Sequence, residues 1–140
     1  MKKYLIALIA LLVVVTGCGN TKKLNCTIEE DGTNGVMNME FDKNDDLTKL
    51  TMTMSEEFEE ELTKEELEMY QGISSLACAS FTAESVECEV NVTSKELKLV
   101  VSYDITKMTD EELAEAGLTK ENTTYDAAKK DLEDDGYTCK

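Results

Sequence analysis

The chain has 140 residues, with 14 lysines against 30 acidic residues, so its formal net charge is −16 at pH 7. This balance argues against a nucleic-acid-binding protein, because phosphate contacts need clusters of lysine and arginine. The length suits one domain with a proper core and is too short for two. The sequence contains no histidine, which removes Ser-His and Cys-His activation of a nucleophile.

The chain begins with the pattern of an export signal that ends at a cysteine. Lys2 and Lys3 precede an apolar run of roughly a dozen residues that starts at Tyr4, and small residues stand directly before Cys18. Such a run is too short to span a bilayer permanently. The four residues V-T-G-C that end at Cys18 resemble the bacterial lipobox, in which the cysteine is diacylated. The alternative is an ordinary secretory signal that happens to end near a cysteine.

A lipobox at this position divides the chain into three parts. Residues 1–17 would be removed as a lipoprotein signal peptide, and residues 18–23 would form the lipidated cysteine and a short tether. Residues 24–140 would form a single domain close to the membrane, because the tether reaches only about 17 Å. The mature chain would carry 12 lysines against 30 acids, so the lipid on Cys18 would anchor it against a mild repulsion from anionic lipid.

The first part of the domain has the alternating pattern of half-buried strands. Residues 23–30, 36–41 and 47–54 each alternate apolar with polar side chains, and polar turns join them. We therefore predict a meander of three antiparallel strands at the start of the domain.

The pattern becomes helical over residues 55–81. Thr63 and Glu66 have the spacing of a capping box, which predicts the start of a helix at residue 64. The apolar residues of this helix fall on one stripe, which we expect to face the sheet. The stripe consists of Leu62, Met69, Ile73, Leu76 and Ala77.

Alternation resumes after this helix and predicts a second group of strands. Residues 86–92 and 97–105 should form a hairpin of two long strands. Two short helices follow. Thr109 and Glu112 have the spacing of a capping box for the first, which Gly117 can end, and residues 123–126 start the second, which Gly136 can end. Residues 137–139 should form a final short strand. This order predicts an α+β fold. We expect a two-layer sandwich, in which helices pack on one face of an antiparallel sheet of about five to six strands.

Four cysteines remain besides Cys18, and an even number in an exported protein indicates two disulfides. We expect Cys26 to bond to Cys139, because each lies on a strand and both would point into one layer if the first and last strands are neighbours. Cys78 lies off the apolar stripe of its helix and is expected to bond to Cys88, ten residues later. Other pairings and four reduced thiols are the alternatives. A zinc site is disfavoured, because the sequence has neither a C-x-x-C pair nor a histidine.

The acidic residues suggest little chemistry beyond solvation. Asp42, Asn44 and Asp46 have the spacing of calcium ligands, but the positions that need glycine and glutamate carry Leu47 and Thr53. An Asx-rich turn is therefore the better interpretation. We interpret the glutamate clusters of residues 56–66 as a solvated face. If they have a function, we expect it to be loose binding of Mg²⁺ or Ca²⁺. We expect no catalytic residue, no cofactor and no dedicated metal site.

Three further stretches carry a family resemblance together with the lipobox and its short tether. They are L-T-K-L-T-M-T-M-S at residues 47–55, S-K-E-L-K-L-V-V-S-Y-D-I at 94–105 and T-Y-D-A-A-K-K-D-L-E-D-D-G-Y-T-C-K at 124–140. With these motifs the chain resembles the YehR-like family of small bacterial lipoproteins, which has no agreed biochemical activity. The resemblance implies a two-layer α/β sandwich on a lipid anchor and supplies no catalytic residues. The four non-lipid cysteines depart from the enterobacterial pattern of the family.

Two functional classes remain. The first is a lipid-anchored, non-enzymatic lipoprotein on the outer side of the cell membrane that binds a small molecule or a protein. The second is an acidic structural or interaction protein at the cell surface with loose divalent-cation binding. A concave apolar pocket lined by Tyr70, Tyr103 or Tyr125 would favour the first, and a convex acidic surface would favour the second. In both cases the lipid on Cys18 binds the membrane, nucleic acid is not a partner, and a monomer is expected.

Overall fold

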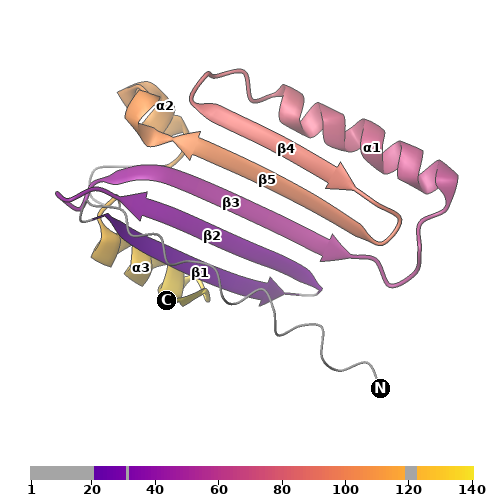
Figure 1. Ribbon diagram of the computed structural model, residues 1–140, viewed down its shortest axis with the longest axis horizontal. Coiled ribbons are helices and arrows are strands. Elements are labelled where there is room, and N and C mark those ends of the chain that lie inside the picture. The colour runs from indigo at the N-terminus through magenta and orange to yellow at the C-terminus, as the bar shows by residue number, and fades with distance from the viewer. Residues whose placement is uncertain (1–20, 31, 119–122) are drawn as a thin grey trace.

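The computed structural model of the chain describes residues 21–30, 32–118 and 123–140. These residues form one antiparallel sheet of six strands and three α-helices, so the fold is α+β (Figure 1). The predicted signal peptide and Cys18 lie outside the described residues. Within the described part of the chain, no helix is long and apolar enough to cross a membrane.

The sheet combines the two groups of strands that the sequence predicts. Its strands follow the order β4-β5-β3-β2-β1-β6, and each neighbouring pair is antiparallel. The meander is β1-β2-β3 and the hairpin is β4-β5, which joins the meander through β5 and β3. The terminal strand β6 pairs with β1, so the first and last strands are neighbours. The bounds are β1 Lys22–Glu30, β2 Thr33–Phe41, β3 Leu47–Glu57, β4 Val86–Val92, β5 Glu96–Asp104 and β6 Thr138–Cys139.

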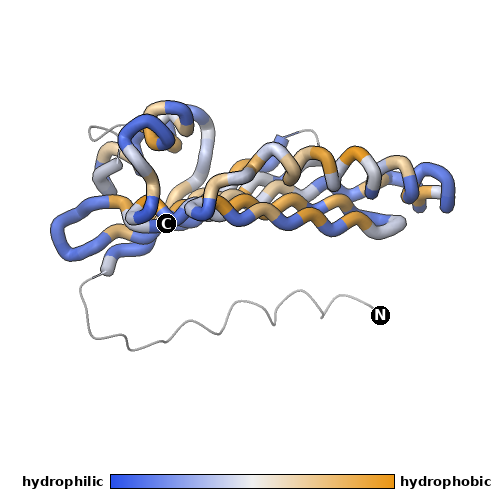
Figure 2. The backbone as a smooth tube through the Cα atoms, turned by 90° about the horizontal axis from the view of Figure 1, so that it is seen from above, coloured by the Kyte–Doolittle hydropathy of each residue, from blue (hydrophilic) through white to orange (hydrophobic). Residues whose placement is uncertain are grey.

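The two faces of the sheet differ sharply in polarity. Residues paired across neighbouring strands share a face, and side chains alternate between faces along each strand. Figure 2 shows this alternation as hydrophobic and hydrophilic residues that follow one another along the strands. One row across the sheet, on what we call the apolar face, contains Leu24, Met39, Leu50, Tyr103 and Val86. The next row, on the polar face, contains Asn25, Asn38, Thr51, Ser102 and Glu87.

The buried core lies at one end of the apolar face. It is built mainly from β1, β2 and β3 and contains Leu24, Cys26, Met39, Phe41, Leu47, Leu50, Ile105 and Ala128. Helix α3 (Tyr125–Asp134) contributes Ala128, and Tyr125 packs edge-on against Phe41 with ring centroids 5.5 Å apart. Helix α2 (Asp110–Glu115) adds Leu113 at the margin of this core.

Helix α1 (Lys64–Ala79) lies beside the edge strand β4 (Figure 1). It begins as predicted, because Thr63 is its N-cap and forms both hydrogen bonds of a capping box with Glu66. The expectation that its apolar stripe faces the sheet is wrong. Met69, Ile73 and Leu76 are 55%, 59% and 72% exposed. Ala77 is exposed as well, and Leu62 is half-buried ahead of the helix.

The physical reason is that other contacts fix the rotation of α1 about its axis. Cys78 is bonded to Cys88, which lies on the apolar face of β4. On the same side of the helix, Ser74 is buried, and Tyr70 packs against Phe58 with ring centroids 5.4 Å apart. These contacts turn the small and polar side of α1 toward the sheet and leave its apolar stripe in solvent.

Candidate functional site

An apolar groove crosses the apolar face beside the core, with a volume of about 240 Å³. Its floor comes from β2, β3 and β5 and includes Met37, Met52, Met54 and Leu99. Three aromatic residues also line it, namely Phe81 after α1, Tyr103 on β5 and Tyr137 after α3. We refer to these seven residues as the groove. It lies between the two edges of the sheet that α1 and α3 contact. Helix α1 contacts β4 at one edge, and α3 contacts β1 and β6 at the other.

The sheet register gathers the methionines of the floor. Met37 lies directly opposite Met52, and Gly35 lies opposite Met54. Gly35 allows a close approach of β1, since a Cβ atom at this position would meet Cγ2 of Ile28 at 2.8 Å. Met54 is 51% exposed, so the groove is open to solvent. Methionine is unbranched and polarizable, and such a floor adapts to apolar ligands of different shape.

A second hollow adjoins the groove and adds negative charge. Its volume is about 390 Å³, and it shares Phe81 and Tyr103 with the groove. Its far side is α2, from which Glu112 and Glu115 line it, and we call it the acidic hollow. Ser85 also lines this hollow, and its buried hydroxyl has no hydrogen-bond partner among the described residues.

The charge of Glu112 is held in place by the start of α2. Its Oε2 atom accepts hydrogen bonds from the Thr109 backbone N–H at 2.7 Å and from the Thr109 hydroxyl at 2.9 Å. These bonds, the backbone one first, lower the pKa of Glu112 below its ordinary value of 4.5. Glu115 is the exposed last residue of the helix. The acidic hollow therefore presents two carboxyl side chains, and the start of α2 favours the charged form of Glu112.

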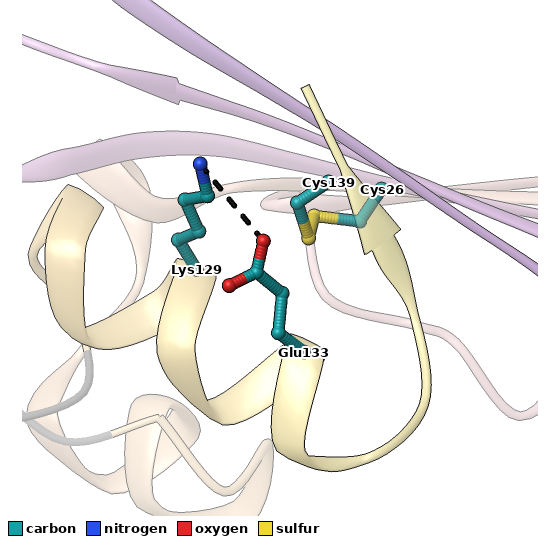
Figure 3. Close-up of a disulfide and its surroundings, with 4 residues drawn as sticks. All are labelled: Cys26, Lys129, Glu133 and Cys139. Carbon is teal, nitrogen blue, oxygen red and sulfur yellow. Dashed lines mark ion pairs between the residues drawn. A yellow bond between two sulfur atoms is a disulfide. The ribbon is translucent and has the colours of Figure 1, made fainter.

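Both disulfides expected from the sequence pattern are present in the structure. Cys26 and Cys139 bridge β1 and β6 with their Cα atoms 4.0 Å apart, and Cys78 and Cys88 bridge α1 and β4 with their Cα atoms 5.4 Å apart. Figure 3 shows the first bond beside α3, next to the ion pair of Lys129 with Glu133.

Each disulfide stands beside one aromatic wall of the groove. Tyr137 lies two residues before Cys139, and its backbone N–H donates to the Leu132 carbonyl at the end of α3. Phe81 lies three residues after Cys78, and its backbone N–H donates to the Cys78 carbonyl at 3.1 Å. The two disulfides, together with these hydrogen bonds, therefore fix the backbone segments that carry Tyr137 and Phe81.

The acidic residues that were considered as calcium ligands form hydrogen bonds within their own loop. The Asp42 carboxylate accepts hydrogen bonds from the backbone N–H groups of Asn44 and Asp46, at 2.8 and 3.1 Å. Both bonds, that of Asp46 first, lower the pKa of Asp42 and turn its carboxylate toward its own loop. Among the described residues, no group of three or more acidic, cysteine or histidine side chains is arranged to hold a metal ion.

Only one of the three tyrosines considered from the sequence lines the groove. Tyr103 does so, whereas Tyr70 packs against Phe58 and Tyr125 packs against Phe41. Sequence reasoning missed Phe81 and Tyr137 as walls of the site. Their closeness in sequence to Cys78 and Cys139 was the available signal.

Neither the family models nor the curated proteins include a match to this chain. Among solved structures, the chain is similar to the NMR structure of the E. coli YehR protein, with a TM-score of 0.62. The match covers 88% of this chain and 93% of that chain at 14% sequence identity. The fold is YehR-like. At this identity the likeness concerns the fold alone.

Proposed function

We propose that this protein is a lipid-anchored, non-enzymatic binding module on the outer side of the cell membrane and a member of the YehR-like family. The lipobox-like sequence supports removal of residues 1–17 and a lipid on Cys18. The fold would be a two-layer sandwich with its helices on the apolar face. The bond from Cys78 to Cys88 and the packing of Ala128 in the core support that arrangement. The domain would act as a monomer.

The observation that carries the binding function is the groove. Ligand sites are typically concave and mostly apolar, and connected apolar surface that stays exposed marks sites of interaction. Thioether, aliphatic and aromatic side chains form most of the lining, and these suit contact with an apolar ligand better than acid–base chemistry. The alternative, an acidic structural protein, accounts for the charge of the chain but not for an open apolar floor.

The ligand would lie on Met37, Met52 and Met54 between the walls Phe81 and Tyr137. Burying one methionine side chain fully against a ligand is worth about 1.5–3 kcal/mol. Met54 is half exposed in the free protein, so it should contribute about 1 kcal/mol of binding free energy.

The first prediction tests this site with the neutral apolar dye N-phenyl-1-naphthylamine. The full chain in phosphatidylcholine nanodiscs should bind the dye, and ring-current shifts should appear on the methyl groups of Met37, Met52 and Met54 in NMR spectra. Met54→Gln should weaken binding about fivefold, because it replaces an apolar contact by a polar group of similar shape. The fluorescence of protein-free nanodiscs is subtracted.

The matched control is Met69→Gln. Met69 is also a methionine that is just over half exposed, but it lies on α1 outside the groove. This variant should bind the dye like the unchanged protein. Equal weakening by both substitutions, or methyl shifts at Met69 and not at Met54, would contradict the groove as the binding site.

A further inference from the structure

We propose that the ligand of the groove is a basic amphipathic peptide segment. Its apolar side would lie on the methionine floor, and its lysine or arginine side chains would reach Glu112 and Glu115 in the acidic hollow. This inference rests on the proposed binding function and names the chemical class of its partner.

The groove and the acidic hollow form one continuous surface. Phe81 and Tyr103 line both the groove and the acidic hollow, so a ligand lying over these two rings meets both parts. A purely apolar ligand would bring no positive charge to Glu112 and Glu115, and a purely cationic one would leave the apolar floor uncovered. An amphipathic segment matches both, which is how apolar grooves recognise the spaced apolar side chains of such helices.

The three α-helices carry more acidic residues than lysines. Helix α2 carries four acidic residues and no lysine, and α1 carries three glutamates and one lysine. Helix α3 carries four acidic residues and two lysines. Two of these three lysines are paired within their own helices, Lys64 with Glu68 at 3.8 Å and Lys129 with Glu133 at 3.9 Å. The helices therefore present an excess of negative charge.

The lysines of the strands are mostly placed on the other side of the sheet. Lys23 and Lys49 share the polar face through their pairing with Glu40, and Lys98 belongs to the same face through its pairing with Ser55. Lys22 is already paired with Asp45 at 2.8 Å. Glu112 and Glu115 beside the groove thus attract a cationic partner, and the net negative charge of the chain repels an anionic lipid or a second copy of this chain. A methionine floor, which adapts to varied side chains, suits a peptide of this kind.

The test uses short synthetic peptides that differ only in charge. One combines leucine with lysine at helical spacing, and its partner replaces every lysine by glutamate. Each carries a single tryptophan, and because the protein contains none, tryptophan fluorescence reports the peptide alone. With the full chain in phosphatidylcholine nanodiscs, the leucine–lysine peptide should bind at least tenfold more tightly than the leucine–glutamate peptide. This preference should shrink at high salt.

Two pairs of variants locate the peptide. Glu115→Lys should weaken binding of the leucine–lysine peptide about fivefold, because it reverses an exposed charge of the acidic hollow. Glu111→Lys makes the same change at an exposed position of α2 outside the hollow and should have a much smaller effect. Met54→Gln should weaken binding, and Met69→Gln should leave it unchanged.

The outcomes separate this inference from the proposed function. Equal binding of both peptides, or dye binding in the groove with no binding of the leucine–lysine peptide, overturns the inference and leaves the groove as a site for neutral apolar ligands. Binding of the leucine–lysine peptide that ignores both Glu115→Lys and Met54→Gln places it elsewhere and also overturns the inference. Self-association that Met54→Gln abolishes in sedimentation velocity would identify a second copy as the occupant instead.

Discussion

At the scale of single residues, the four bonded cysteines do more than close loops. Cys26 is completely buried in the core, and its bond to Cys139 holds the strand that follows Tyr137. Cys78 lies in the last turn of α1, on the side of the helix that faces the sheet. The turn that follows α1 carries Phe81. Each bond therefore fixes one wall of the groove, and the shape of the site should depend on the oxidation of these cysteines.

The two bonds should differ in their effect on stability. The pair Cys26 and Cys139 is separated by 113 positions, and the pair Cys78 and Cys88 by ten. In the chain-entropy model a loop of about 100 residues gives roughly 4–5 kcal/mol and a short loop about 3 kcal/mol or less. We therefore expect the double substitution of Cys26 and Cys139 by alanine to lower the free energy of unfolding more than that of Cys78 and Cys88. Urea unfolding measures both, and the reverse order would contradict this ranking.

The sequence anticipated these residues unevenly. Strand alternation placed Cys26 inward, and the helical spacing placed Cys78 away from the apolar stripe, and both features are present in the structure. Sequence patterns placed Phe81 at the end of the helical stretch 55–81 and Tyr137 in the final strand 137–139. The structure places Phe81 just after α1 and Tyr137 just before β6. These two residues line the groove only because α1 and α3, which are far apart in the sequence, both end near the same part of the sheet.

At the scale of elements, caps and turns follow local chemistry and were predictable. The capping boxes of α1 and α2 and the glycines after α2 and α3 lie where the sequence put them, and Gly117 and Gly136 adopt φ values of 72° and 93°. The orientation of α1 was not predictable from its apolar stripe. A stripe predicts a buried face only when the partner surface lies opposite it, and here a disulfide and an aromatic pair at the sheet edge set the rotation instead.

The cap of α1 should make its stability depend on pH. Hydrogen bonds from Thr63, the backbone N–H first, lower the pKa of Glu66 below its ordinary value of 4.5. The stabilisation is therefore present above pH 4.5 and is lost as the pH falls through the lower pKa of the folded state. Glu66→Gln should reduce the free energy of unfolding at about pH 7, and the difference from the unchanged protein should shrink toward about pH 3.

Two controls accompany this measurement. Thr63→Ala removes the capping oxygen itself and should cost about 1 kcal/mol. Glu65→Gln lies in the same turn but leaves the capping box intact, so its effect should not follow the same pH dependence. A difference between Glu66→Gln and the unchanged protein that stays constant with pH would contradict the role of the carboxylate.

At the scale of the whole molecule, the site arises from incomplete cover of the sheet. The apolar face extends over all five long strands, whereas α1 and α3 contact its two opposite edges and leave the groove between them. Sequence analysis predicted the α+β class and the strands, because alternation is a local property. It could not predict that the helices leave the groove uncovered, because the position of each helix depends on contacts between residues far apart in the chain.

We propose that the protein is an exported, lipid-anchored module whose groove walls are held by oxidised cysteines. The most direct test is the intact mass of the protein extracted from membranes, measured after alkylation with and without prior reduction. We expect a chain that starts at Cys18, carries a diacylglyceryl group and gains alkyl groups on four cysteines only after reduction. A chain that retains residues 1–17 and alkylates all five cysteines without reduction would contradict the claim.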